Sequence, residues 1–347
     1  MYQFFTPDGF RLNKRVSNSS RLVLVEAEKY GVKWEIIPGT QIVSLNYQGK
    51  TTSFFHQVPA TTTALAKYAC TFKKITSNLL HTAGVQVPQG FRIKKDYSES
   101  YLKEVYETLK KPLVVKPSNG YFGDNITVGI NKYEDYKKAL DLALSYSPQK
   151  AIAIVEEMFE GKEYRIIATQ EKVLGILHRV PANITGDGKH TVAELIAKKN
   201  QEPIRAEDGT KSHLKIKIDK DLKANIAEQN IELETVIEKG KQIFLRKVSN
   251  VSKGGEAIDC TDLAHPSVHE IATKAVKAIP GLSFAGLDFI TTDISSPQND
   301  NSYVIIEVND SPGFDIHDYP YEGKNRHVAR EFLFLHFPEL RDKRPQS

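Results

Sequence analysis

The hydrophobic positions near the N-terminus follow first a helical and then a strand period. Residues 21–32, RLVLVEAEKYGV, place apolar side chains at helical spacing and predict a helix that ends at Gly31. The stretches 34–39 and 41–56 have the composition of strands, and Gln48-Gly49 marks the turn between two of them. The chain therefore opens with a helix followed by a small sheet.

A second helix is expected across residues 63–83, where apolar positions return to helical spacing. Three residues that favour turns, Gly84, Pro88 and Gly90, then mark a boundary. We therefore expect residues 1–90 to form a first unit.

The expected second unit covers residues 91–157. Strands are predicted at 112–117 and 151–157, and the helix between them is expected to be capped by Asn131 with Glu134 three residues later. One face of that helix gathers apolar and aromatic side chains, namely Tyr133, Tyr136, Leu140, Ala143 and Leu144.

The remainder, residues 158–347, forms the expected third unit. Its predicted elements are strands 163–169 and 172–180, a helix opened by Thr191 with Glu194 as a capping box, a charged helical stretch near 219–239, the strand 243–247, a helix from Ser267, strands 284–294 and 303–309, and a closing helix from about Asn325. Strands and helices alternate along the chain, which predicts an α/β or α+β protein.

Composition and charge narrow the class of protein. The chain has 347 residues, 40% hydrophobic and 26% charged, which are globular values. A net charge of +4 without a clustered basic face gives no reason to expect a nucleic-acid partner. No apolar run approaches about 18 residues, so no membrane span is expected. Only Cys70 and Cys260 occur, and residues 1–15 have no apolar signal core, which favours a reducing, cytoplasmic location.

The stretch 303–310, YVIIEVND, begins as a buried strand and ends with polar residues. Strand side chains alternate between faces, so Glu307 and Asn309 point the same way. Asp288 is the only charged residue in the apolar stretch 282–290. If the two strands are neighbours, the three side chains converge and suit a hard cation such as magnesium. The alternative is that Asp288 and Glu307 face solvent, but a lone carboxylate among apolar residues favours a site.

The loop in 114–125, VVKPSNGYFGDN, follows a buried strand that ends at Lys116. Gly120 and Gly123 allow backbone amides to turn onto an anion, and the lysine can reach phosphates. The alternative is a surface lysine before an ordinary hairpin. GDGKHT, residues 186–191, is a near miss to a P-loop, because it lacks the leading glycine and has histidine in place of Ser/Thr.

Carboxylates gather in residues 155–165, VEEMFEGKEYR, where one strand ends and the next begins. Glu156, Glu157 and Glu163, with strand-end backbone groups, can bind an adenine amine and ribose hydroxyls. Taken singly, each is more often a solvated glutamate.

Four stretches together resemble the ATP-grasp superfamily: 155–165, 177–196 (LHRVPANITGDGKHTVAELI), 250–262 (NVSKGGEAIDCTD) and 307–326 (EVNDSPGFDIHDYPYEGKNR). The order of these features along the chain also matches that superfamily: a strand lysine, a small loop, a carboxylate hinge, and late strands that carry Asp and Glu-x-Asn. The closer resemblance is to the glutathione synthetase half of bifunctional bacterial glutathione enzymes and to the ATP-grasp part of cyanophycin synthetase. It covers roughly residues 60–335.

This resemblance implies an α+β ATP-grasp fold. Its parts would be a small N-terminal pre-ATP-grasp domain (1–90), a central lid subdomain (91–157) and a C-terminal catalytic subdomain with an antiparallel sheet (158–347). The chain has neither the glutamate–cysteine ligase half nor the Mur-ligase-like half of the two relatives. It is therefore expected to be a lone ligase module or the partner of another protein.

The resemblance also implies roles for single residues. Lys73 and Lys116 would bind phosphates, Glu156 and the backbone after it would hold adenine, and Glu163 would hold ribose. Glu157 would also belong to the nucleotide site. The magnesium ligands would be Asp288, Glu307 and Asn309.

The acyl-phosphate end of the site is implied to lie at Arg179, which with Lys116 would be catalytic. His317 would touch the substrate. A substrate loop is implied for Asn250, Ser252, Gly254 and Gly255. The loop with Gly120 and Gly123 would close as a lid that keeps water from the intermediate.

The implied activity is that of an ADP-forming carboxylate–amine ligase acting on amino acids or short peptides through an acyl phosphate. Its cofactors would be ATP and Mg²⁺, with Mn²⁺ as an alternative ion. Its partners would be small molecules, and the resemblance allows a homodimer. Two other functions stay open, an ATP-grasp kinase that releases a phosphorylated product and a non-catalytic nucleotide-binding partner.

Two residues depart from the family pattern. Asn125 stands where the phosphate loop often has a second glycine, although asparagine tolerates left-handed geometry. Lys253 replaces a common threonine of the substrate loop. The sequence therefore leaves both the carboxylate and the amine unidentified.

Overall fold

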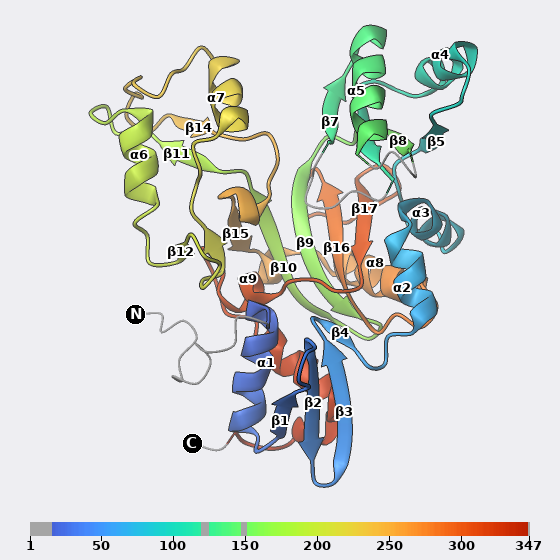
Figure 1. The fold of residues 1–347 in the computed structure, drawn as a ribbon, viewed down its shortest axis with the longest axis vertical. Helices are drawn as coiled ribbons and strands as arrows, with labels where there is room; N and C mark the ends of the chain where they lie inside the picture. The colour runs from blue at the N-terminus through green and yellow to red at the C-terminus, as the bar shows by residue number, and fades with distance from the viewer. Residues whose placement is uncertain (1–15, 119–124, 147–150, 346–347) are drawn as a thin grey trace.

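The computed structural model describes residues 16–118, 125–146 and 151–345. Helices and mostly antiparallel sheets occupy separate layers (Figure 1), which confirms the α+β class. Across the described part of the chain, helices are too short or too polar to cross a membrane.

The centre of the molecule is a five-stranded antiparallel sheet in the order β15-β10-β9-β16-β17. Its strands are β9 (Lys162–Thr169), β10 (Val173–Val180), β15 (Glu256–Asp259), β16 (Phe284–Thr291) and β17 (Tyr303–Asn309). The helices beside it are α2 (Ala64–Thr71), α3 (Lys73–Thr82), α8 (Pro266–Lys277) and the short α9 (Asp315–Asp318).

Strand alternation gives the central sheet one apolar and one polar face. Ile166, Leu287 and Phe289 are fully buried and belong to the cluster that includes the apolar side of α8. Asp288 lies between Leu287 and Phe289 in β16 and therefore points to the opposite face. The polar face is thus available for a site.

A second sheet, β1-β2-β3-β4, joins the two ends of the chain. Its strands are β1 (Lys33–Ile36), β2 (Ile42–Tyr47), β3 (Lys50–Phe55) and β4 (Val58–Pro59), and it packs with α1 (Asn18–Lys29) and α10 (Val328–His336). The ring of Phe332 in α10 lies 5.4 Å from that of Phe54 in β3, so the C-terminal helix completes the N-terminal core.

A third sheet has the order β5-β8-β6-β7 and lies on the side of the central sheet where β16 and β17 are found (Figure 1). It consists of β5 (Gly90–Lys94), β6 (Leu113–Pro117), β7 (Thr127–Ile130) and β8 (Ile152–Glu157), with α4 (Glu99–Thr108) and α5 (Tyr133–Ser145). The predicted apolar face of α5 is confirmed in the core cluster here. The predicted cap is wrong, because Lys132 is the N-cap and the Asn131 amide donates to the Gly129 carbonyl.

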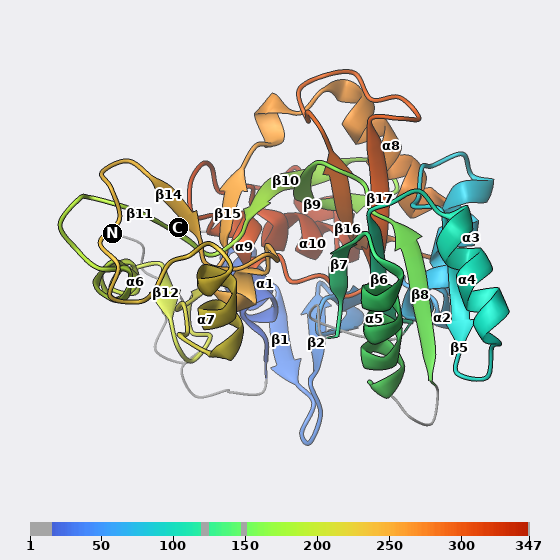
Figure 2. The same ribbon diagram turned by 90° about the horizontal axis from the view of Figure 1, so that it is seen from above.

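The side subdomain, residues 181–246, has a small core of its own. It contains β11 (Asn183–Thr185), β12 (Arg205–Ala206), β13 (His213–Leu214), β14 (Gln242–Phe244), α6 (Val192–Lys199) and α7 (Lys220–Ala227). The predicted capping box of α6 is confirmed. Figures 1 and 2 show this subdomain and the third sheet on opposite sides of the central sheet. The boundaries of the three expected units stay a prediction.

The predicted extent of two helices is wrong. The helix across 63–83 is interrupted at Phe72, which has φ −106° and ψ 96°, and the Thr76 hydroxyl donates to the Ala69 carbonyl at the end of α2. The charged helix expected to reach 239 ends at Ala227, and Asn230 then turns the chain at φ 57°. Neither break is marked by a glycine or a proline in the sequence.

The start of α10 depends on a buried carboxylate. Asp318 accepts hydrogen bonds from the Val328 and Ala329 backbone N–H groups. Burial raises the pKa of Asp318 to about 7, although these two donors oppose the shift. In the unfolded chain the pKa is about 3.9. A raised folded-state pKa means that Asp318 stabilises fully below about pH 4 and loses this contribution as the pH rises through about 7.

We therefore expect the free energy of unfolding of the natural protein to fall relative to that of Asp318→Asn between about pH 5 and about pH 8. Asparagine keeps an acceptor oxygen and does not titrate. Urea unfolding at the two pH values measures both proteins. If the free energy of unfolding of the natural protein does not fall relative to that of Asp318→Asn between the two pH values, Asp318 does not titrate in this range.

Candidate functional site

The strands predicted to carry metal ligands are neighbours, as expected. β16 pairs with β17 so that Asp288 lies directly opposite Glu307 and Gly286 opposite Asn309. The two carboxylates therefore lie close together on the polar face of the central sheet.

Asp288 is held by two arginines. Its Oδ1 lies 2.6 Å from Arg165 Nη1 and 3.3 Å from Arg179 Nη1, and the residue is only 7% exposed. Burial alone would raise the pKa of Asp288, but the two guanidinium groups outweigh it and hold the pKa below its usual range. Asp288 is therefore a buried, ionised carboxylate.

Arg165 was missed in the sequence, although a signal was present. It lies two residues after Glu163 in β9, so both side chains share the polar face. β9 pairs with β16 so that Arg165 lies directly opposite Asp288. A second charged residue on the same face as Glu163, directly before the apolar run 166–168, could have pointed to it.

Arg179 links Asp288 to Glu163, the expected ribose ligand. Arg179 Nη1 lies 2.9 Å from Glu163 Oε1, and the Ser249 hydroxyl donates to the other carboxylate oxygen. Burial raises the pKa of Glu163, and the charge of Arg179 only partly opposes the shift. One guanidinium thus connects two of the predicted site carboxylates.

Both expected phosphate-binding lysines form ion pairs with expected ligands. Lys73, at the start of α3, lies 2.6 Å from Glu307 Oε1. Lys116, at the end of β6, lies 2.5 Å from Glu156 Oε2. Their side chains are 13% and 8% exposed, so the cations are largely withdrawn from solvent.

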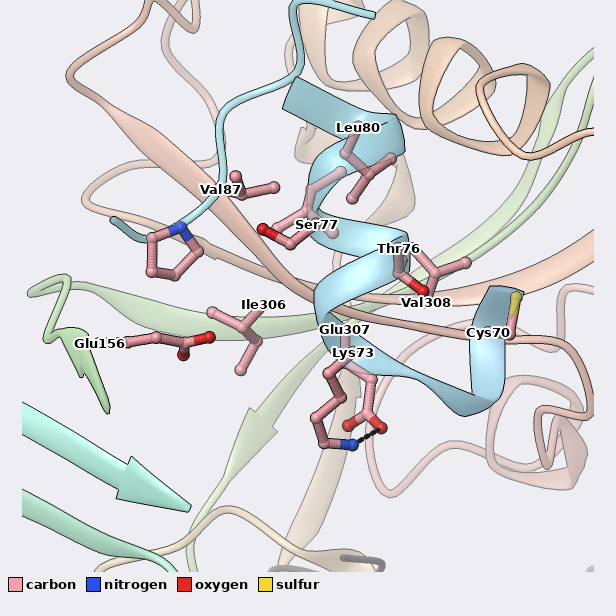
Figure 3. Close-up of a pocket in the computed structure, with 12 residues that line it drawn as sticks. Cys70, Lys73, Thr76, Ser77, Leu80, Val87, Glu156, Ile306, Glu307 and Val308 are labelled. Carbon is pink, nitrogen blue, oxygen red and sulfur yellow. Dashed lines mark hydrogen bonds and ion pairs between the residues drawn. The ribbon is translucent and has the colours of Figure 1, made fainter. Parts of the chain in front are cut away.

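A pocket brings three of these residues together. Lys73, Glu307 and Glu156 all line it, and Figure 3 shows the ion pair between the first two. The other lining residues come from α2, α3, the following loop and β17: Cys70, Thr76, Ser77, Leu80, Val87, Pro88, Ile305, Ile306 and Val308. Residues predicted separately for phosphate, adenine and metal therefore share one apolar-walled pocket.

Cys70 in this pocket is not an activated nucleophile. Burial raises the pKa of its thiol to about 12, and the charges of Asp310 and Glu307 add to the shift. The thiol is therefore neutral at neutral pH.

Other predicted residues lie away from this pocket or outside the described residues. The Glu157 carboxylate accepts from the Lys110 backbone N–H, outside the pocket lining. Gly120 and Gly123 fall outside the described residues.

His317 was expected to touch the substrate, but the structure buries it completely. Among the described residues, neither of its ring nitrogens has a hydrogen-bond partner. Burial lowers the pKa of His317 to about 3, so the ring is neutral. A Cβ atom on Gly175 of β10 would lie 2.8 Å from its Nδ1, which shows how closely the ring packs on the sheet.

The expected substrate loop forms a short 3-10 helix, residues 251–253. Asn250 caps it by accepting from the Ser252 backbone N–H at 3.0 Å. The next strand, β15, pairs with β10 so that Ala257 lies opposite Arg179. The loop therefore leads directly into the strand beside the expected catalytic arginine.

The donor set fits a magnesium ion that arrives with a nucleotide. In the part of the chain that the structure describes, no three His, Cys, Asp or Glu side chains are grouped to hold a metal. Glu307 and Asn309 share one strand, and Asp288 lies opposite Glu307. Magnesium in nucleotide sites takes one or two protein carboxylates and completes its shell with phosphate oxygens and water.

Comparisons with known proteins match nearly the whole chain, although no family model matches it. Cyanophycin synthetase of Crocosphaera subtropica is 33% identical over 326 residues, 94% of this chain and 37% of that protein. The glutathione biosynthesis bifunctional protein of Clostridium perfringens is 33% identical over 329 residues, 92% of this chain and 41% of that protein. The crystal structure of a bifunctional glutathione synthetase from Pasteurella multocida superimposes with a TM-score of 0.73 at 30% identity, covering 94% of this chain and 44% of that one. The chain thus spans about two fifths of the length of these relatives.

The position of Lys73 at the pocket generates a direct test of nucleotide binding. If Lys73 binds phosphate, as the resemblance implies, we expect Lys73→Met to weaken binding of a magnesium complex of a non-hydrolysable ATP analogue about tenfold or more, which is the effect of losing a charge-assisted hydrogen bond. Isothermal titration calorimetry measures the affinity.

Lys74→Met is the matched control, because Lys74 is the next residue of α3, carries the same charge and is exposed. Its affinity should equal that of the natural protein. Equal losses in the two variants would indicate a general effect of charge, and no loss in either would remove Lys73 from the phosphate site.

Proposed function

Because the chain has the ATP-grasp fold and resembles the ligases named above over more than nine tenths of its length, we propose that it is an ADP-forming carboxylate–amine ligase. The observation that carries this proposal is the pocket that Lys73, Glu156 and Glu307 share. A phosphate-binding cation, a carboxylate for the base and a metal-binding carboxylate are the groups that a magnesium–nucleotide complex requires.

In this proposal the two lysines exchange partners when ATP binds. Lys73 leaves Glu307 and Lys116 leaves Glu156, and both turn to phosphate oxygens. Glu307 then becomes available to magnesium, and Glu156 becomes available to the adenine amine. Until then, the two ion pairs neutralise four charges that are at least partly withdrawn from solvent.

Glu307, Asn309 and Asp288 are proposed to hold the magnesium ions. The metal supplies neutralisation of the charge on the phosphates. Glu163, already fixed by Ser249 and Arg179, is proposed to accept from the ribose hydroxyls.

The proposed chemistry has two steps. A substrate carboxylate oxygen attacks the γ-phosphorus, the bond from that phosphorus to the bridging oxygen of ADP breaks, and an acyl phosphate forms. The substrate amine then attacks the acyl carbon, phosphate leaves, and the nitrogen loses a proton. Arg179 faces the acyl-phosphate end in this proposal, where its fixed positive charge stabilises the negative charge that develops.

The proposed substrates are an amino acid or short peptide that carries the carboxylate and a second small molecule that carries the amine. The names of the relatives, cyanophycin synthetase and glutathione synthetase, are consistent with this class. A cytoplasmic location and a homodimer stay predictions, as do the three unit boundaries.

The reaction type can be tested by screening amino acids and dipeptides in pairs. With the right acid but no amine, ATP turnover should be slow, because the shielded acyl phosphate has no acceptor. Adding the amine should raise ADP release and give a product lighter than its two reactants by one water. Hydroxylamine should trap the intermediate as a hydroxamate. Coupled ADP assays and mass spectrometry measure these results.

Glu307→Gln tests whether this turnover depends on the pocket, because the change keeps the side-chain volume and removes the charge. It should lose most of the turnover while remaining folded. If ADP instead forms in step with a stable phosphorylated product and hydroxylamine traps nothing, the protein is a kinase.

A further inference from the structure

The side subdomain contacts the loop 250–255 through two buried arginines. Arg205 and Arg246 are 3% and 6% exposed. Each donates to one of two consecutive carbonyl oxygens of the loop, those of Gly254 and Lys253. Buried arginines that point at backbone carbonyls indicate a loop whose shape is fixed from outside.

Arg205 comes from β12 and makes several well-formed contacts. Its Nη1 donates to the Gly254 carbonyl at 2.9 Å and to the Leu214 carbonyl at 3.0 Å. Its Nη2 lies 3.2 Å from Glu256 Oε1, and Lys199 binds the same carboxylate oxygen. Arg205 thus ties the loop, and the first residue of β15 after it, to the side subdomain.

Arg246 makes the second connection between the loop and the side subdomain. Its Nε donates to the Lys253 carbonyl at 3.1 Å, and its Nη2 reaches the Lys217 carbonyl at 3.1 Å and Asp219 at 2.7 Å. Asp219 is also the N-cap of α7. The carbonyl of Lys253 is therefore joined to a helix of the side subdomain.

Other backbone groups of the loop also form hydrogen bonds. The Lys253 and Gly255 N–H groups donate to the Asn250 carbonyl, and Gly254 has φ 93°. A side chain on Gly254 would meet Ile216 at 2.7 Å. No substitution at Gly254 is therefore free of strain.

The loop is also packed against the strand that carries Arg179. A Cβ atom on Gly255 would lie 2.8 Å from the carbonyl oxygen of Val180, the residue after Arg179. Arg179 Nε donates to the Ser249 carbonyl at 3.4 Å. A shift of the loop would therefore displace the surroundings of Arg179 while leaving Lys73 and its pocket in place.

We propose that Arg205 and Arg246 are positioning residues that fix the loop 250–255 against β10 and thereby set the affinity for a non-nucleotide substrate. The inference rests on the proposed function, because it takes this loop as the substrate loop. The residues touch neither substrate nor nucleotide and act through the carbonyls of Lys253 and Gly254. A purely structural role would lower stability without separating the KM values of the substrates.

Arg246→Ala is the main test, because its ion-pair partner Asp219 is about half exposed and can be solvated after the change. Lys247→Ala is the matched control. It removes the same charge one residue away, and its pair with Glu228 is exposed on the surface. Arg205→Lys is a second variant, which keeps the charge beside Glu256 but cannot reach all acceptors of the guanidinium.

Two measurements are made on each protein. Hydrogen exchange of the amides in residues 250–255 reports the shape of the loop without any assay of function. In Arg246→Ala it should accelerate about tenfold or more, which is the effect of losing a hydrogen bond to a charged group. The KM for one non-nucleotide substrate should rise by a similar factor, whereas the KM for ATP and the exchange of β16 and β17 should not change. Lys247→Ala should match the natural protein, and Arg205→Lys should lie between the two.

The outcomes separate the two proposals. Unchanged exchange in Arg246→Ala overturns the positioning role, whether or not the natural protein proves to be a ligase. Faster exchange with all KM values raised together, or with none raised, also overturns it, because the effect is then structural only. If the natural protein forms no amide with any substrate pair, the proposed function fails, and that failure is visible before any variant is made.

Discussion

The ion pair between Asp288 and Arg165 is the constraint on which the centre of this molecule depends. An isolated buried carboxylate costs roughly several kcal/mol, and it persists only with a close cation and further hydrogen bonds. Strand register supplies the cation, because Arg165 lies directly opposite Asp288. Arg179 reaches the same oxygen and extends the pairing to Glu163. The polar face of the sheet can thus hold four charges largely away from water, while the opposite face packs under α8.

The same principle governs the pocket. Lys73 and Lys116 are largely withdrawn from solvent and each is paired with a carboxylate, so neither cation is left uncompensated. Polyphosphate can replace both carboxylates at once and releases them for other roles. In the proposed function a nucleotide would bind by exchanging these existing ion pairs for contacts with phosphate oxygens. This limits the desolvation cost, because the lysines are already partly dehydrated before the nucleotide enters.

Strand periodicity predicted the part of the site that lies on long strands. Glu307 and Asn309 share a face because the period is two, and Asp288 stood out in an apolar run. Arg165 was not predicted, because its pairing with Asp288 depends on the register between β9 and β16, which the sequence does not give. The side subdomain was not foreseen as a unit, since its strands have only two or three residues and carry no period. The break at Phe72 was also not predicted, because it contains no helix-breaking residue and is accompanied by the local hydrogen bond from Thr76 to the Ala69 carbonyl.

The central claim is that this chain activates a carboxylate as an acyl phosphate. The most direct measurement uses a substrate acid whose carboxylate oxygens are ¹⁸O, with ATP, magnesium and the amine, followed by mass spectrometry of the released phosphate. The account predicts that each phosphate carries one ¹⁸O atom and that the amide keeps the other, because one carboxylate oxygen leaves with the phosphoryl group. Released phosphate without ¹⁸O, formed alongside amide or without it, would contradict the claim.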